Sequence, residues 1–330
     1  RPFRHRLGSL QWQRLVELIE ERNPNNIGIN ISEDFAIADG LVHTDYEALK
    51  ESLPKQLEDK LISAEKLAIA WIETRTEKEM ELYNTLVSVT HDIIDEAFSE
   101  KVIKPGVTTT DDVVWFLRQK VTDMGLETWF HPTVDVQRSE EALKSHIESF
   151  SKAKEKTIIL PGDLLHCDFG ISYITLNTDC QQHAYVLKEG ESEVPQYLQE
   201  AFEKGNRLQD ILTSNFEEGK TGNEILLASL QQAKSEGLQP SIYTHPLGTY
   251  GHSAGPTIGM WDSQGGVPGT GDYPLYENTV YAIELNTTVT IPEWKKDIRI
   301  MLEEAGFYGT NGFRYVNGRQ KAIKPIKVEK

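Results

Sequence analysis

The stretch Leu164-Leu165-His166-Cys167-Asp168-Phe169-Gly170 places an aspartate inside an otherwise apolar strand. Burying a carboxylate among apolar side chains is costly unless it is paired or bound to a metal ion. Asp179 follows eleven residues later, and a turn around residues 172–175 would fold the two strands into a hairpin with the aspartates directly opposite each other. Such close carboxylates repel, and one pKa rises sharply unless a cation lies between them. This stretch therefore predicts a cation site.

The same anomaly recurs twice nearer the C-terminus. The apolar runs 280–286 and 298–304 contain Glu284 and Glu303. Four acids in apolar strands indicate a site for a hard cation, because such ions prefer carboxylate oxygens as ligands.

The chain also runs through one structural plan twice. Residues 104–108 and residues 219–224 each lead into a predicted helix. In each half a turn then precedes an apolar strand that ends in a carboxylate, Asp168 in the first half and Glu284 in the second. The repeated order favours an internal duplication, and we expect the functional groups at the seam between the two copies.

Two histidines, His245 and His252, stand seven residues apart in a glycine- and proline-rich segment, residues 244–256. This spacing excludes a helical histidine pair of the H-E-x-x-H kind. One histidine can bind a metal through a neutral ring nitrogen while the other faces a substrate. Carboxylates with a single imidazole suit Mn²⁺, Fe²⁺, Co²⁺ or Zn²⁺ and disfavour copper.

Together these motifs resemble a metallopeptidase family that includes methionine aminopeptidase, aminopeptidase P, prolidase and creatinase. The residues that carry the resemblance are Asp168-Phe169-Gly170, Asp179, His245, His252, Glu284 and a final glutamate. It covers residues 76–305, and segments 73–83 and 102–115 resemble the aminopeptidase P and prolidase branch. It implies an α/β (α+β) pita-bread fold with pseudo-twofold internal duplication, preceded by part of a small α/β N-terminal domain.

The resemblance also implies a centre of two divalent metal ions. Asp179 and Glu303 would bridge both ions, Asp168 would hold one, and His245 and Glu284 would hold the other. Manganese is the expected metal, with zinc, cobalt and iron as alternatives.

Three residues are implied as catalytic. Glu284 would act as general base toward the attacking water, and His252 would stabilise the tetrahedral intermediate. His146 is the candidate for a further histidine that contacts the substrate, and His131 is its rival.

The final metal ligand departs from the family pattern. An Arg-Ile-Glu pattern would put this ligand two residues after Arg299, but Met301 stands there. Glu303 restores a carboxylate at the same strand parity and is preferred, whereas Glu304 would serve if the strand bulged. Other departures from the pattern are Pro246, Ser253, Leu285 and Asn286, with Gln182 and His183 near the position of a missing arginine.

The domain boundary is expected near residues 72–76. Residues 1–72 would be the remnant of an N-terminal α/β domain, with strands at residues 27–31 and 35–41. Residues 73–330 would form the catalytic metallopeptidase domain, opened by a capping box at Thr76-Glu77-Lys78-Glu79.

Composition excludes several classes of protein. With 51 acids against 34 bases, the formal net charge of −17 argues against nucleic-acid partners. No stretch approaches the roughly 18 apolar residues of a membrane-spanning helix, so no membrane association is expected. Two cysteines exclude a disulfide scaffold. Cys167 and Cys180, expected opposite each other in the hairpin, are predicted to be packed thiols, with a cross-strand disulfide as the alternative.

The first functional hypothesis is a dinuclear aminopeptidase that cleaves the N-terminal Xaa-Pro bond of peptides with proline at the second position. The alternatives are an Xaa-Pro dipeptidase (prolidase), a creatinase-like amidinohydrolase, and a non-catalytic pita-bread protein that binds peptides. A homodimer and a cytoplasmic location are also expected. Residues 1–10 contain neither an initiator methionine nor an apolar signal core, which indicates a truncated N-terminus, and an export signal in a missing segment would change the expected location.

Overall fold

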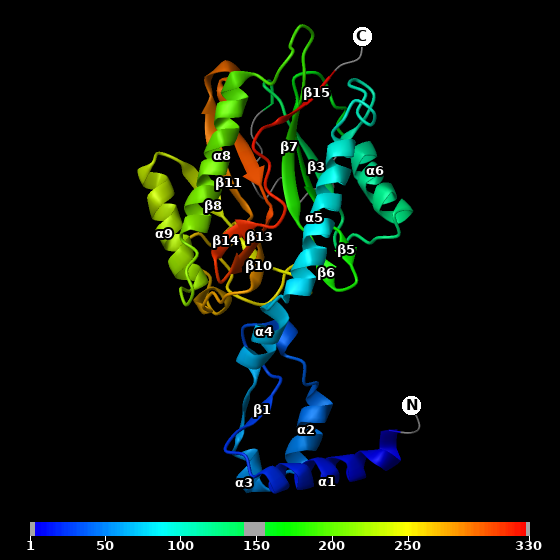
Figure 1. The fold of residues 1–330 in the computed structure, drawn as a ribbon, viewed down its shortest axis with the longest axis vertical. Coiled ribbons are helices and arrows are strands. Elements are labelled where there is room, and N and C mark those ends of the chain that lie inside the picture. Colours follow the sequence, from blue (N-terminus) through cyan, green and yellow to red (C-terminus); the bar gives the residue numbers. More distant parts are fainter. Residues whose placement is uncertain (1–3, 142–155, 328–330) are drawn as a thin grey trace. The chain divides into compact units, whose positions relative to one another are not determined.

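The structure is a computed structural model that describes residues 4–141 and 156–327 of the 330-residue chain. The chain divides into two compact units, Arg1–Ile72 and Glu73–Lys330 (Figure 1). Among the described residues, no helix has the length and apolar character needed to cross a membrane.

The first unit is a small α/β assembly. Its elements are α1 (Arg4–Arg22), β1 (Ile27–Ile29), a short 3₁₀ turn (Ala36–Ala38), α2 (His43–Ser52), α3 (Lys55–Glu58), β2 (Leu61–Ser63) and α4 (Glu65–Glu73). β1 and β2 pair in parallel. Ile29, Leu49, Leu53 and Leu57 form its core.

The strand expected at residues 35–41 is wrong, since the structure has the 3₁₀ turn there. Just before this segment, the Ser32 hydroxyl accepts a hydrogen bond from the Phe35 backbone N–H at 2.8 Å. Such a local bond from a serine side chain offers the backbone an alternative to strand pairing. The apolar run is therefore held as a turn.

The second unit consists of two similar halves. Within the described residues, the first half comprises α5 (Glu77–Ala97), α6 (Thr110–Asp123), β3 (Thr133–Gln137), β4 (Leu164–Phe169) and β7 (Cys180–Val186). The second half comprises α8 (Gln196–Ser214), α9 (Gly222–Ser235), β8 (Gln239–Ile242), β11 (Leu285–Ile291) and β12 (Lys296–Leu302). The strand orders β7-β4-β3 and β12-β11-β8 match, and every pair is antiparallel. This repetition confirms the predicted duplicated α/β fold.

The remaining strands extend this framework. The sheet β14-β13-β10-β9 contains β9 (His245–Leu247), β10 (Thr279–Ala282), β13 (Ala305–Gly309) and β14 (Gly312–Tyr315). The strand β15 (Lys324–Ile326) pairs in parallel with β7, and β5 (Ser172–Tyr173) pairs with β6 (Leu176–Asn177) in a short hairpin. Two further 3₁₀ turns lie at Thr270–Asp272 and Pro292–Trp294.

Matched capping residues start three of the helices. Thr76, Thr109 and Thr221 each accept a hydrogen bond from the backbone N–H three residues later, and the acidic side chain at that later position bonds back. Because these reciprocal bonds satisfy backbone donors that a helix start leaves unpaired, they fix where α5, α6 and α9 begin. The capping box predicted at Thr76 is confirmed.

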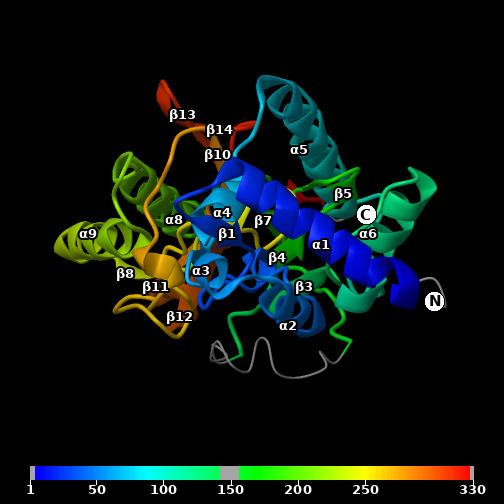
Figure 2. The same cartoon turned by 90° about the horizontal axis from the view of Figure 1, so that it is seen from below.

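Two helices from the same half pack on each half-sheet. α5 packs on β4 and β7, α6 packs on β3, α8 packs on β11 and β12, and α9 packs on β8. Figure 2 shows the α5/α6 pair and the α8/α9 pair on opposite sides of the strands, in agreement with Figure 1.

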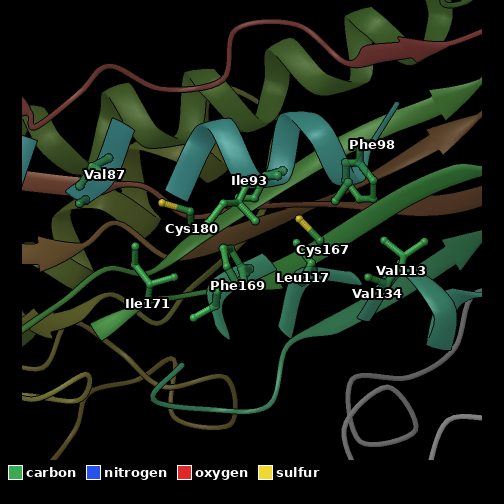
Figure 3. Packing of buried hydrophobic residues seen from close by; sticks show 14 of the residues in the cluster. Val87, Ile93, Phe98, Val113, Leu117, Val134, Cys167, Phe169, Ile171 and Cys180 are labelled. Atoms are coloured by element: carbon green, nitrogen blue, oxygen red, sulfur yellow. The ribbon is translucent and has the colours of Figure 1, made fainter. Parts of the chain in front are cut away.

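The core between α5, α6 and the first half-sheet contains both cysteines (Figure 3). Cys167 and Cys180 are buried beside residues such as Ile93, Leu117 and Phe169. Both thiols are free, which confirms the prediction of packed thiols. Burial raises the pKa of both, as expected for inert core cysteines.

The two half-sheets meet where an isolated β-bridge joins β7 to the residue directly after β12. The Gln181 backbone N–H donates to the Glu303 carbonyl at 2.9 Å, and the Glu303 N–H donates to the Gln181 carbonyl at 3.4 Å. His183 also crosses this seam: it donates through Nδ1 to the Leu165 carbonyl at 2.9 Å and accepts from the Met301 N–H at 3.1 Å. The seam therefore lies where the predicted acids lie.

A buried carboxyl at the start of the second unit makes stability depend on pH. Glu73 is 3% exposed, and burial raises its pKa from about 4.5 to about 8, partly opposed by a hydrogen bond from Tyr273. Because its pKa is raised in the folded chain, protonated Glu73 makes its full contribution to stability below about pH 4.5. This contribution is lost as the pH rises through about 8. The free energy of unfolding of the parent chain should therefore fall between pH 5 and pH 8. In Glu73→Gln we expect this fall to be smaller by on the order of a few kcal/mol. Urea denaturation at both pH values measures this, with the exposed Glu77→Gln as the control that should behave like the parent chain.

Candidate metal centre

The first half contributes its acids from one face of the β4–β7 hairpin. Cys167 and Phe169 face the helices, so Asp168 between them faces away, because strand side chains alternate. Asp168 lies directly opposite Gln181, and Asp179 shares the parity of Gln181 just before β7. All of these side chains therefore face the seam.

The register of this hairpin corrects one expectation. Asp168 pairs with Gln181 and not with Asp179, and Cys167 pairs with Gln182 and not with Cys180. The connection, residues 170–179, includes the separate β5–β6 hairpin and shifts the pairing by two residues. The aspartates still interact across this offset, since the Asp168 charge helps to raise the pKa of Asp179.

The second half contributes two glutamates that are neighbours across strands. Leu285 of β11 lies opposite Leu302 of β12, so Glu284 and Glu303 follow in register at the next position. Leu285 and Leu302 face the core against α8, so both glutamates face away from it. Four predicted acids from the two halves thus converge on one side of the seam.

His245, the first residue of β9, joins this group. Its Nε2 lies 3.7 Å from Asp179 Oδ2 and 3.5 Å from Glu303 Oε1. Its Nδ1 lies 3.0 Å from the Pro246 carbonyl, which fixes Nδ1 as the protonated nitrogen. Burial, with the neighbouring His252, lowers the pKa of His245 to about 3. The ring is therefore neutral and directs a lone pair at the acids, as a metal-binding histidine requires.

The electrostatics of the acids demand a counter-charge. Burial raises the pKa of Asp179, Glu284 and Glu303 well above the ordinary range, and the neighbouring carboxylates raise each further. Glu303 is 1% exposed and Asp179 is 4% exposed. Holding these groups ionised at neutral pH requires cations among them.

The donor set fits divalent ions. The ligand atoms of Asp179, His245 and Glu303 lie within 4.8 Å of one another. Among the described residues, the buried oxygens Asp179 Oδ1 and Glu303 Oε1 have no hydrogen-bond donor. Buried oxygens in this state are available as ligands, and four carboxylates with one imidazole match Mn²⁺, Fe²⁺, Co²⁺ or Zn²⁺.

Adjacent residues Glu303 and Glu304 face opposite ways. Glu303 faces Asp179 and His245, whereas Glu304 lies 2.6 Å from His91 Nε2 on α5 and accepts from Gln182 Nε2 at 3.1 Å. His91, which the helix pattern alone suggests is a core residue, is thus the ion-pair partner of a buried acid. The Glu304 carboxylate raises the pKa of His91 despite burial, which acts in the opposite direction.

His252 lies at the open side of the cluster. Its ring centroid is 4.5 Å from that of His245 and 5.4 Å from that of Trp129, both edge-on. The side chain is exposed, so a bound molecule can reach it. Gly251 allows this approach, because a Cβ there would lie 2.2 Å from the Trp129 ring.

The two candidates for a further substrate histidine differ in position. His146 lies outside the described residues. His131 is exposed, with Nδ1 2.7 Å from Arg118 Nη1 and its ring against Trp115 of α6. Its contacts among the described residues are therefore with the outer helix α6.

Residues 81–306 match the family described as Metallopeptidase family M24. The chain belongs to this family. It is therefore a metal-dependent hydrolase by family, as the sequence motifs predict.

Solved structures share the fold of this M24 chain at low sequence identity. The X-Pro aminopeptidase from Thermotoga maritima has a TM-score of 0.66 at 16% identity, covering 96% of this chain and 79% of that chain. The Xaa-Pro dipeptidase from Bacillus anthracis has a TM-score of 0.60 at 18% identity, covering 95% and 78%. The prolidase from Pyrococcus furiosus has a TM-score of 0.57 at 18% identity, covering 93% and 80%. No curated protein matches the chain.

Sequence reasoning missed two residues that contact groups of the candidate centre in this M24 chain. Gln181 donates through Nε2 to both Glu284 and Glu303, while its Oε1 lies 2.9 Å from His166 Nε2. Since His166 donates to the amide oxygen, it turns the amide N–H group toward the acids. Gln181 is neutral, so no unusual charge in the strand marks it as part of the site. Its position two residues after Asp179 does indicate that the two side chains lie on the same face of the strand.

Trp129 is the second residue that was missed. Its indole Nε1 donates to the Thr178 carbonyl at 2.8 Å, directly before Asp179, and its ring contacts His252. In this M24 chain Trp129 therefore links the turn that carries Asp179 to the loop that carries His252.

Proposed function

We propose that this chain is a dinuclear metallopeptidase that releases the N-terminal residue before proline. The observation that supports it best is the donor set at the seam: four converging carboxylates and one neutral imidazole, drawn from both halves. Two divalent ions bound there would supply Lewis acidity and a water of lowered pKa. The ions would be held by Asp168, Asp179, His245, Glu284 and Glu303.

The chain's own groups would move the protons. Glu284 accepts the proton of the attacking water and passes it to the leaving nitrogen. His252 lies at the exposed edge of the cluster, where it can donate to the carbonyl oxygen as negative charge develops. Gln181 orients Glu284 and Glu303 through its amide.

We also propose a division of roles along the chain. The unit Glu73–Lys330 holds every described residue of the centre and would be the catalytic domain. The unit Arg1–Ile72 would be an accessory α/β domain, and His146 would contact the substrate.

Peptide length separates the peptidase alternatives. With Mn²⁺ supplied, we expect cleavage of Ala-Pro-Pro, no cleavage of Ala-Pro, and complete inhibition by EDTA. Chromatographic detection of released alanine measures this, and elemental analysis should find about two ions per chain. Cleavage of the dipeptide alone would assign a dipeptidase. No cleavage and no metal uptake would assign a peptide-binding protein, and either result would overturn the proposal.

A further inference from the structure

A pocket of about 480 Å³ opens on the same side of the second half-sheet as the two glutamates. Its floor comes from β8, β11 and β12. Its lining among the described residues includes Lys234, Ser241, Trp261, Asn286, Thr288 and Arg299. No residue assigned to the metal centre belongs to this lining.

Strand parity connects the pocket to the centre. Ile298, Ile300 and Leu302 of β12 pack in the core, so Arg299, Met301 and Glu303 share the opposite face. On β11, Asn286 lies opposite Met301 and Thr288 lies opposite Arg299. The nearest residues of the pocket floor therefore lie two residues along the strand from the glutamates. This separation is about 7 Å.

The pocket is cationic on an acidic chain. Its described lining contains two basic residues, Arg299 and Lys234, and no aspartate or glutamate, whereas the whole chain has a formal net charge of −17. A local excess of positive charge in a concave surface attracts anions.

Hydrogen bonds fix the backbone of Arg299, but no acidic side chain among the described residues neutralises the charge of its guanidinium group. Its backbone is held on both sides by Gln137, which donates to the Arg299 carbonyl at 2.8 Å and accepts from its N–H at 2.9 Å. Within residues 4–141 and 156–327, no carboxylate forms an ion pair with its guanidinium. The side chain is half-buried, and burial lowers its pKa, opposed by the nearby Tyr243. A partly desolvated cation gains most from an anionic ligand that restores its lost hydrogen bonds.

The departure from the Arg-Ile-Glu pattern explains why Arg299 lies in the pocket, at a distance from Glu303. Met301 stands two residues before Glu303, and Arg299 stands four before it, a separation of about 13 Å along a strand. The arginine side chain and one or two extended peptide residues, at about 3.4 Å each, span this gap. A carboxylate near the scissile bond would therefore reach the guanidinium.

We propose that this pocket is a substrate subsite in which Arg299 binds a carboxylate of the peptide. The carboxylate comes either from the C-terminus of a short peptide or from an acidic side chain on the N-terminal residue. The guanidinium fork suits bidentate binding of either, and Trp261 provides an apolar wall. This inference rests on the proposed function, because it treats the neighbouring centre as the site of cleavage.

Matched peptides test the subsite in the Mn²⁺-loaded chain. One pair, Ala-Pro-Gly and Ala-Pro-Gly-amide, differs in the C-terminal carboxylate. The other pair, Glu-Pro-Gly-amide and Gln-Pro-Gly-amide, differs in the N-terminal side chain. We expect kcat/KM to favour the carboxylate in one pair by about tenfold, equivalent to about 1.4 kcal/mol. The pair that responds identifies the source of the carboxylate.

Variants assign the preference to Arg299. In Arg299→Met the ratio of acid to amide should fall to about one, and Arg299→Lys should restore part of it, because charge returns without the fork. Arg314→Met, on β14 outside the lining, is the matched control and should keep the parental ratio. A preference that survives in Arg299→Met, or no preference in either pair, would overturn the subsite.

A binding measurement separates this test from the proposed function. If the chain cleaves no peptide, the proposed function fails, and calorimetry of the same pairs still measures the subsite. A tenfold affinity difference that Arg299→Met removes would support it, and equal affinities would reject it. Thermal melting of each variant checks that the fold is retained.

Discussion

Glu303→Gln is expected to remove peptide hydrolysis and metal binding together, whereas Glu304→Gln, one residue further along, is expected to retain both. Glu303 faces Asp179 and His245, and glutamine cannot supply an anionic bridging ligand. Loss of groups that merely support metal ligands typically costs 10–100-fold, so we expect kcat/KM to fall by more than about 100-fold. Glu304 faces His91 and Gln182 on the other side of the strand.

The same pair of variants should change stability in opposite directions. In the metal-free chain at pH 8, Glu303→Gln removes one of several buried, mutually repelling carboxylates, so the free energy of unfolding should rise. Glu304→Gln removes a buried charge that is already hydrogen-bonded, and it should lower the free energy of unfolding by about 1–3 kcal/mol.

Elemental analysis, kinetics and urea denaturation of both variants measure these effects. Each variant serves as the control for the other, because the two substitutions are chemically identical and adjacent. Full metal content in Glu303→Gln, or loss of metal in Glu304→Gln, would contradict the assignment of the bridging ligand.

The convergence of the four acids was largely predictable because these residues violate local rules. An acid in an apolar strand is conspicuous, and Asp168, Asp179, Glu284 and Glu303 all carry this signal. Parity also predicts that Glu303 and Glu304 face opposite ways, but a bulge would reverse them, and only the observed register of β11 and β12 excludes one.

The parts that could not be predicted depend on loops and neutral groups. The register of β4 and β7 is set by a connection that contains its own hairpin, so a simple turn gives the wrong pairing. Gln181 and His166 act through hydrogen bonds, which leave no trace in charge or hydropathy. His91 resembles a core residue until its partner Glu304, 213 residues away, is known.

Removing the divalent ions is expected to destabilise the chain strongly, and more so at higher pH. An ion that binds only the folded chain stabilises it by about 2.7 kcal/mol at a free concentration 100 times its Kd, so two sites contribute roughly 5 kcal/mol. Ligand carboxyls must lose protons to bind, and burial raises the pKa of Asp179, Glu284 and Glu303.

The sign of the pH dependence follows from these raised values. In the metal-free chain, stability from protonated acids is complete below their ordinary pKa and is lost as the pH rises through the raised values. Bound ions remove this penalty, so the melting temperatures with Mn²⁺ and with EDTA should separate further at pH 8 than at pH 5.5. Glu303→Gln should narrow the separation at pH 8, and Glu304→Gln should keep it. Equal Mn²⁺ shifts at both pH values would show that the ions bind elsewhere, because only a site of raised-pKa carboxyls couples binding to proton release over this range.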